Sequence, residues 1–250
     1  MTLWGYDLWS VTLAFARIGT LVMLMPGIGE AAVPARARIG FAVLLAVMLA
    51  PEVAPAPGDV WGASGQVIVE IAVGFVLGGV ARILMTGLAT AGQIFGLETG
   101  LSFAQTADPL QGQSGGQAGQ IISVFLGLLG TTLVFATNLH HVFLLGIRDS
   151  YTLFPSGKGF SVGDASDFAL DAFGDAFRIG LQIAAPVMVA GMVFRLGLGV
   201  LARLAPSIQV FFVAMPLNIL GGFIVLTLGL SSGMLVWLDR LQHYASAGWR

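Results

Sequence analysis

Apolar residues in this chain are grouped into six long runs, separated by short polar stretches or by stretches rich in proline and glycine. The runs cover residues 8–25, 39–50, 60–88, 121–147, 179–202 and 208–238. A helix needs about 20 largely apolar residues to cross the hydrocarbon core of a bilayer. The pattern therefore predicts an all-α fold of about six long helices of the membrane-spanning type, arranged as hairpins.

Two of the runs have unusual features. The run at 39–50 is short for a membrane span, so we expect it either to use residues 33–38 as a polar first turn or to be buried in protein rather than lipid. Pro186 and Pro216 fall inside the last two runs. A proline inside a helix removes one backbone hydrogen bond, so we expect both helices to be kinked.

The composition supports a membrane protein and excludes several classes of function. Of the 250 residues, 56% are apolar and only 10% are charged, against about 25% charged in typical soluble domains. The net charge of −2 provides no positive field for a nucleic-acid backbone, so no nucleic-acid partner is expected. The absence of cysteine excludes disulfides, thiolate metal sites and a cysteine nucleophile.

No enzyme, cofactor or metal motif is found along the chain. There is no G-x-S-x-G elbow and no phosphate-binding G-K-[ST]. His140 and His141 are adjacent, so on a helix they point about 100° apart and cannot both bind one metal. Four aspartates follow helical spacing on one face, which predicts a solvated face and leaves a cation site as the alternative. They are Asp164, Asp167, Asp171 and Asp175.

Four charged residues lie within or between the apolar runs: Arg17, Glu70, Arg82 and Arg195. Such residues are costly in lipid and usually face protein or water. We expect each of them to pair with a residue of a neighbouring subunit. The alternative is a secondary transporter that relays ions through Glu70, Arg82 or Glu98. Transporters often contain internal repeats, and residues 1–120 and 121–250 show no such repeat.

Glycines at every fourth position predict close helix packing. Gly92, Gly96 and Gly100 form one such stripe, and small residues at this spacing let two helices approach closely. The stretch that follows, residues 100–120, reads GLSFAQTADPLQGQSGGQAGQ and contains a single charge. It is too polar to span a membrane. Its apolar residues could seal a hole, and the alternative is a slack connector.

Three separated blocks resemble one known family. They are ARIGTLVMLMPGIGEAAVPARARIGFAVLLAVMLAP (residues 16–51), AGQIFGLETGLSFAQTADP (residues 91–109) and LARLAPSIQVFFVAMPLNILGGF (residues 201–223). Each is similar to the corresponding block of the FliR-type export-gate proteins of bacterial flagella (the FliR/SctT family). The blocks come in the same order and at similar spacing, so the resemblance extends over essentially the whole chain.

The resemblance implies a subunit of the flagellar type III protein export gate. Such a subunit lies in the bacterial inner membrane at the flagellar basal body and occurs once per gate. It assembles with FliP-like and FliQ-like subunits into a helical ring through which unfolded flagellar proteins pass. By the same resemblance, residues 1–150 are FliP-like and residues 151–250 form a FliQ-like hairpin. The virulence (injectisome) branch of type III secretion has the same architecture and is the alternative.

The resemblance also assigns roles to two segments. The loop at about 101–119 is implied to plug the pore, and the turn at about 203–207 is implied to face the FlhB-like switch protein. Relatives commonly carry an aromatic residue at the position of Thr106, so Phe103 is left as the only aromatic of this plug. The plug residues are Leu101, Phe103, Thr106, Asp108, Pro109, Leu110, Gly112, Gly115, Gly116 and Gly119, and the turn residues are Arg203, Pro206 and Ser207.

Overall fold

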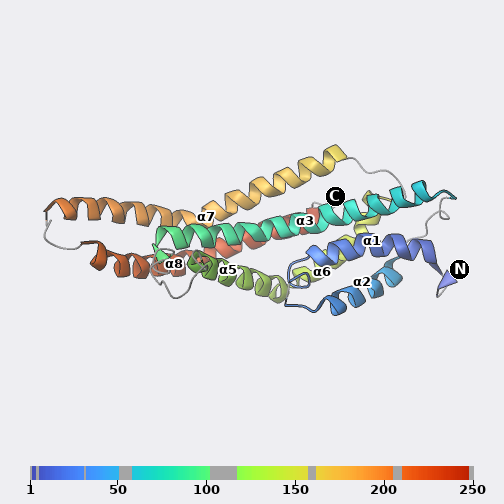
Figure 1. Ribbon diagram of the computed structural model, residues 1–250, viewed down its shortest axis with the longest axis horizontal. Helices are drawn as coiled ribbons and strands as arrows, with labels where there is room; N and C mark the ends of the chain where they lie inside the picture. Colours follow the sequence, from blue (N-terminus) through green and yellow to red (C-terminus); the bar gives the residue numbers. More distant parts are fainter. Residues whose placement is uncertain are drawn as a thin grey trace. The chain divides into compact units, whose positions relative to one another are not determined.

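The computed structural model describes residues 2–3, 6–30, 32–50, 58–101, 117–156, 162–204 and 210–247. Helices make up almost all of these ranges, apart from two short antiparallel strands, β1 (Thr2–Leu3) and β2 (Tyr6–Asp7). The predicted all-α fold is confirmed (Figure 1). The helices are α1 (Leu8–Leu24), α2 (Ala35–Leu49), α3 (Val60–Glu98), α5 (Gln117–Ala136), α6 (Leu139–Leu153), α7 (Val162–Leu204) and α8 (Val210–Ala247).

Helix α2 begins directly after Pro34, which is its N-terminal flanking residue. It therefore includes Arg36 and Arg38, which form a polar first turn before the short apolar run. This is one of the two alternatives expected from the sequence. Helix α1 ends just before Pro26 and Gly27, and Gly27 has a left-handed φ of 86°. Proline and a left-handed glycine both stop helix propagation.

The expectation of one continuous helix over residues 121–147 is wrong. The described chain breaks this run into α5 and α6, which meet at an angle of 73°. The break occurs at Asn138, which has a left-handed φ of 59°. Asparagine is one of the few residues other than glycine that adopts this conformation at low cost.

The expectation of six membrane-spanning helices is also too high for the described residues. By length and composition three helices can cross a membrane, namely α3, α7 and α8, or four if the bent pair of α5 and α6 counts as one span. Helices α1 and α2 have 17 and 15 residues. At 1.5 Å per residue they fall short of the roughly 30 Å hydrocarbon core.

The chain divides into two compact units, each made of segments distant in sequence. The first contains residues 1–84, 131–174 and 240–250, and the second contains residues 85–130 and 175–239. The division at residue 150 into FliP-like and FliQ-like parts stays a prediction, because these units group residues by contact and not by relationship to other subunits.

The core of the first unit lies where α1, α2, α3 and α6 meet. It is built from small and branched side chains, among them Ala14, Ile18, Ala42, Val73 and Ile147. Helix α3 approaches α1 at two glycines. A Cβ atom at Gly78 would lie 3.0 Å from the Leu21 carbonyl oxygen, and one at Gly74 would meet the Arg17 carbonyl oxygen. These contacts place the Arg17 segment directly against α3.

The second unit contains the C-terminal part of α3, the first part of α5 and most of α7 and α8. Helices α3 and α7 approach closely at a pair of glycines, because a Cβ atom at Gly87 would lie 2.6 Å from the Ala176 carbonyl oxygen and one at Gly180 would lie 2.8 Å from the Gly87 carbonyl oxygen. The rings of Phe95 and Phe223 pack edge to face, with centroids 5.4 Å apart. Pro186 and Pro216 lie inside α7 and α8, and the kinks expected there stay predictions.

Candidate functional site

The charges within the apolar runs are arranged around Arg17 in the first unit. Arg17 and Glu70 are 1% and 0% exposed, and Arg17 Nε donates a hydrogen bond of 2.6 Å to Glu70 Oε2. The pair joins α1 to α3. A buried charge is costly unless it is paired and hydrogen-bonded, and here each charge neutralises the other.

The remaining donors of Arg17 bind the end of α6. Nη1 donates to the carbonyl and hydroxyl oxygens of Ser150, both at 3.2 Å, and Nη2 donates to the Phe154 carbonyl oxygen at 2.7 Å. The guanidinium carbon lies 4.2 Å from the centroid of the Tyr151 ring. The last carbonyl groups of a helix lack partners within the helix and carry partial negative charge. Arg17 therefore connects α1, α3 and the C-terminal end of α6.

The other two charges are also paired within the chain. Arg82 Nη1 lies 2.5 Å from Glu30 Oε1, and Arg195 Nη2 lies 2.7 Å from Glu98 Oε2. The expectation that these charges find their partners on neighbouring subunits is wrong. The structural reason is that segments distant in sequence bring an acid of the same chain to each of the three arginines: Glu70 lies inside α3, Glu30 in the loop after α1 and Glu98 at the end of α3.

The end of α3 comes directly before the predicted plug, and its contacts are well defined. Helix α3 ends at Glu98, and Gly100 has a left-handed φ of 74°, the conformation that most often terminates a helix. Thr99 is buried, and its hydroxyl donates to the Phe95 carbonyl oxygen at 2.9 Å. Leu101 is half-buried and is the last described residue of this segment.

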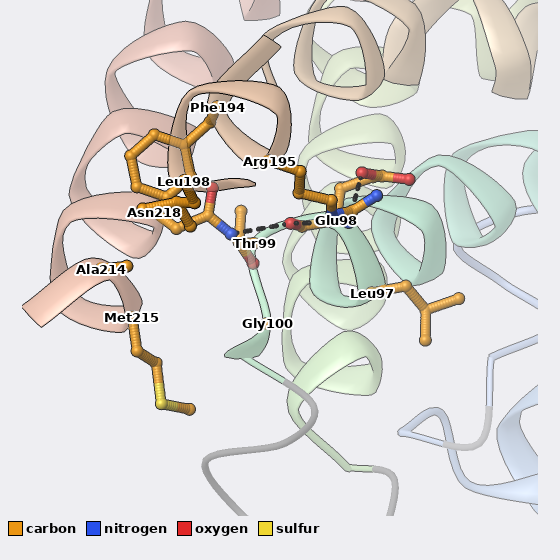
Figure 2. Close-up of a pocket in the computed structure, with 10 residues that line it drawn as sticks. All are labelled: Leu97, Glu98, Thr99, Gly100, Phe194, Arg195, Leu198, Ala214, Met215 and Asn218. Carbon is orange, nitrogen blue, oxygen red and sulfur yellow. Dashed lines mark hydrogen bonds and ion pairs between the residues drawn. The ribbon is translucent and has the colours of Figure 1, made fainter. Parts of the chain in front are cut away.

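Glu98 joins this helix end to two other helices of the second unit, α7 and α8 (Figure 2). Arg195 of α7 forms the ion pair with its carboxylate, while the aligned hydrogen bond of Arg195 Nη2 goes to the Glu98 carbonyl oxygen at 3.4 Å. Asn218 of α8 donates to the same carbonyl oxygen at 2.9 Å. Both the side chain and the main chain of Glu98 are thus held.

A cavity of about 170 Å³ lies at this helix end. Its walls are mostly apolar and come from α3, α7 and α8, with Phe194, Leu198 and Met215 among the lining residues. In Figure 2 the Asn218 amide points from α8 toward the α3 end, and Phe194 and Leu198 lie on the same side as Asn218. The cavity and the Glu98 contacts make the α3 end a defined attachment point for the segment that follows.

The other predicted site residues are distributed as follows. Gly92 lies against α5, since a Cβ atom there would lie 2.5 Å from Ser123 Cα. Gly96 is buried. Gly100 has no described atom within 4 Å of an added Cβ, so its left-handed backbone is the observed reason for glycine.

Most of the predicted plug and turn residues lie outside the described residues. Within the described ranges, Gly119 belongs to α5, and Arg203 is exposed in the last turn of α7. The remaining ones, outside these ranges, are Phe103, Thr106, Asp108, Pro109, Leu110, Gly112, Gly115, Gly116, Pro206 and Ser207. Their assigned roles stay predictions.

Sequence reasoning missed Asn218 and Ser150 as partners of the charged residues. Asn218 is a polar residue inside the apolar run at 208–238, and such residues usually have a specific partner, so that signal could have identified it. Ser150 acts mainly through its position at the end of α6, which the sequence does not reveal. Among the described residues, no three His, Asp or Glu side chains gather as a metal site would require.

Comparison with known proteins shows what the chain is similar to. It is 44% identical over 244 residues to the "Flagellar biosynthetic protein FliR" of Caulobacter vibrioides, covering 96% of this chain and 95% of that protein. It is 31% identical to the protein of the same name from Bacillus subtilis, over 88% of this chain and 85% of the relative. Similarity to the "Yop proteins translocation protein T" of Yersinia pestis is 26% over 60% of this chain.

The family match covers nearly the whole chain. Residues 8–244 match the family described as "Bacterial export proteins, family 1". This range includes all seven described helices except the last residues of α8, together with the three arginine-centred ion pairs. On this evidence the chain belongs to family 1 of the bacterial export proteins, the family of the flagellar biosynthetic protein FliR.

Proposed function

We propose that this chain is a subunit of the flagellar type III protein export gate. The observation that carries the proposal is the 44% identity to Caulobacter FliR over 96% of the chain. The flagellar relatives match more of the chain than the Yersinia translocation protein does, at 88% against 60% coverage for the Bacillus relative. The flagellar branch is therefore preferred over the virulence branch.

The subunit acts in the bacterial inner membrane, at the flagellar basal body, together with FliP-like and FliQ-like subunits. The apolar surfaces of α7 and α8 support this assembly, because only 22% and 17% of their most apolar windows are buried within the chain. Side chains such as Val189, Leu196 and Leu228 are largely exposed. Apolar surface of this extent requires lipid or another subunit to cover it.

The contribution of the chain to export is to line and close a channel, without a chemical reaction. Residues 101–119 plug the channel at rest and move aside for unfolded flagellar proteins, and the turn at 203–207 faces the FlhB-like switch protein. The exposed Arg203 suits a contact with another protein at this end of α7. The fixed α3 end supplies a stable base for a plug that begins at Leu101.

The proposal is tested by deleting the gene in the organism of origin and measuring flagellar proteins in the culture medium. Export should stop and should return when the full chain is supplied. A chain that lacks residues 111–119 loses six residues of the connection, at most about 20 Å of reach, and the first three residues of α5. It should assemble normally but leak potassium from the cells. Unchanged flagellar export in the deletion strain would refute the gate function. A gate that stays ion-tight with the shortened loop would refute the plug role of residues 101–119 but not the gate function of the chain.

A further inference from the structure

The residues that hold the α3 end are placed to control where the following segment starts. We propose that Glu98, Arg195 and Asn218 are positioning residues that attach the end of α3 to α7 and α8 and thereby keep the plug seated. The inference rests on the proposed function, because it takes the segment after Leu101 to be the plug. It goes further by assigning the seating of that plug to three residues of this chain.

The attachment has two parts with different chemistry. Arg195 neutralises the Glu98 carboxylate at 2.7 Å, so this part depends on opposite charges. Asn218 donates to the Glu98 carbonyl oxygen at 2.9 Å, so this part depends on the backbone and not on the charge of Glu98. Because carbonyl groups at a helix end lack partners within the helix, the amide of Asn218 holds the helix terminus itself.

Two glycines leave the space that the attachment needs. A Cβ atom at Gly191 of α7 would lie 2.8 Å from Glu98 Oε2, and one at Gly222 of α8 would collide with Thr99 Cγ2. Any larger residue at Gly191 would push the carboxylate away from Arg195. A larger residue at Gly222 would push the helix end away from α8. Both helices are therefore shaped to receive residues 98 and 99.

The path of the chain is defined up to the start of the plug segment. The Gly100 N–H donates to the Leu97 carbonyl oxygen at 3.2 Å, and the Thr99 N–H donates to the Phe95 carbonyl oxygen at 3.0 Å. These bonds and the left-handed Gly100 fix the direction in which the chain leaves α3. A displacement of Glu98 would therefore displace Thr99 and Gly100 with it.

The Glu98–Arg195 pair differs from the buried Arg17–Glu70 pair in its exposure. Arg195 is 56% exposed and Glu98 is 19% exposed, against 1% and 0% for Arg17 and Glu70. An ion pair with one exposed member contributes less to global stability than a fully buried pair. Charge reversal at the exposed Arg195 is therefore compatible with folding, and its main consequence falls on the position of the helix end. Glu98→Arg also places a longer side chain where Glu98 Oε2 is buried next to Gly191, so it carries a folding cost of its own.

Charge exchange tests the ionic part in cells that express the complete gate. Glu98→Arg and Arg195→Glu should each raise potassium leak several-fold at normal gate abundance, because each places like charges together. The double variant restores an opposite pair and should return the leak toward the wild-type value. Arg178→Glu is the control, since Arg178 is an exposed arginine of the same helix. A double variant as leaky as the worse single variant would overturn the proposal.

Matched glycine substitutions test the fit without changing charge. Gly191→Ala and Gly222→Ala should raise the leak. Gly197→Ala on α7 and Gly221→Ala on α8 should not, because an added Cβ there meets no described atom within 4 Å. Equal leak in all four variants would contradict the proposed fit.

Hydrogen exchange in the purified gate keeps the proposal testable if a charge variant assembles poorly. Asn218→Leu removes one neutral donor and should speed amide exchange at Thr99 and Gly100, with unchanged exchange at Gly87 in the same helix. Unchanged exchange at Thr99 and Gly100 would overturn the proposal. If the gate with the shortened loop leaks potassium while none of these variants does, the plug role is supported and the positioning role is refuted. If the gate with the shortened loop stays ion-tight, the plug role itself is refuted.

Discussion

Arg17 contributes to stability through partners on three helices rather than through one ion pair. Its guanidinium contacts Glu70 of α3 and the carbonyl groups at the end of α6, all in a buried setting. Removing one member of a buried pair leaves the other charge without compensation, and that loss is larger than the net gain from forming the pair. Substitution of Arg17 therefore tests how this chain tolerates charge inside its apolar core.

We predict that Arg17→Met destabilises the purified protein in detergent by about 3–5 kcal/mol. Adding Glu70→Leu to this variant should recover much of the loss, because no unpaired carboxylate remains. The measurement is the midpoint temperature of unfolding. Arg82→Met is the matched control: Arg82 is 46% exposed, so its loss should cost no more than about 1 kcal/mol. Equal losses for Arg17→Met and Arg82→Met would contradict the buried-pair account.

The positions of the charged residues could be predicted from the sequence, but their partners could not. Arg17 and Glu70 stand 53 residues apart, and no local pattern links them. The prediction placed each partner on another subunit because a charge is costly in lipid and the run at 39–50 is too short for a lipid span, which indicated helices surrounded by other subunits. Long-range packing of α1 on α3 brings Glu70 to Arg17, and that packing depends on Gly74 and Gly78 together with the hydrophobic core.

At the scale of single elements, the close approach of helices depends on particular glycines. Gly92 of α3 lies against the backbone of Ser123 in α5, and Ser123 Oγ donates to the Ala89 carbonyl oxygen at 2.7 Å. The stripe spacing identified Gly92 from the sequence. It could not identify Gly87 and Gly180, because neither glycine belongs to a run of glycines at every fourth position.

Substitution at Gly92 should separate these two helices. Gly92→Ala places a Cβ in contact with the Ser123 backbone, and overpacking of this kind costs about 1–3 kcal/mol. Gly79→Ala on the same helix should instead raise stability by up to about 1 kcal/mol, since alanine favours helix and an added Cβ at Gly79 has no described neighbour within 4 Å. Thermal unfolding in detergent measures both variants. A stabilised Gly92→Ala protein would show that α3 and α5 are not in close contact.

The break between α5 and α6 depends on the left-handed backbone at Asn138. A β-branched residue is disfavoured in this conformation by roughly 1–2 kcal/mol, whereas glycine adopts it freely. We predict that Asn138→Val lowers the unfolding temperature and that Asn138→Gly leaves it unchanged or raises it. If Asn138→Val were as stable as wild type, α5 and α6 would form a straight helix in solution.

This break was not predictable from the apolar pattern. No proline or glycine stands between Ala136 and Leu139, so the run at 121–147 has the composition of one helix. The apolar runs also end short of α3 and α7, because the polar ends of these helices lie outside the runs. The helical spacing of the glycines at 92–100 and of the four aspartates at 164–175 indicated these extensions instead. Periodicity identifies the apolar part of a helix better than its ends.

At the scale of the whole molecule, membership of the export family was predictable because three separated sequence blocks carry it, and the match over residues 8–244 agrees. The plug was placed by that resemblance, and its central residues lie outside the described ranges, so its role remains a prediction. What the structure adds is the fixed α3 end at its base. The family relationship indicates that the chain functions in a protein-export apparatus, and the uncovered apolar helices require lipid or another subunit to cover them.

The most direct test of the central claim is native mass spectrometry of the tagged chain, extracted in mild detergent from cells that express it at its natural level. The account predicts one copy of this 26.0 kDa chain in a larger particle that contains FliP-like and FliQ-like subunits. A particle that contains only a single 26.0 kDa chain, at detergent concentrations that keep other membrane complexes intact, would contradict the claim that this protein is an export-gate subunit.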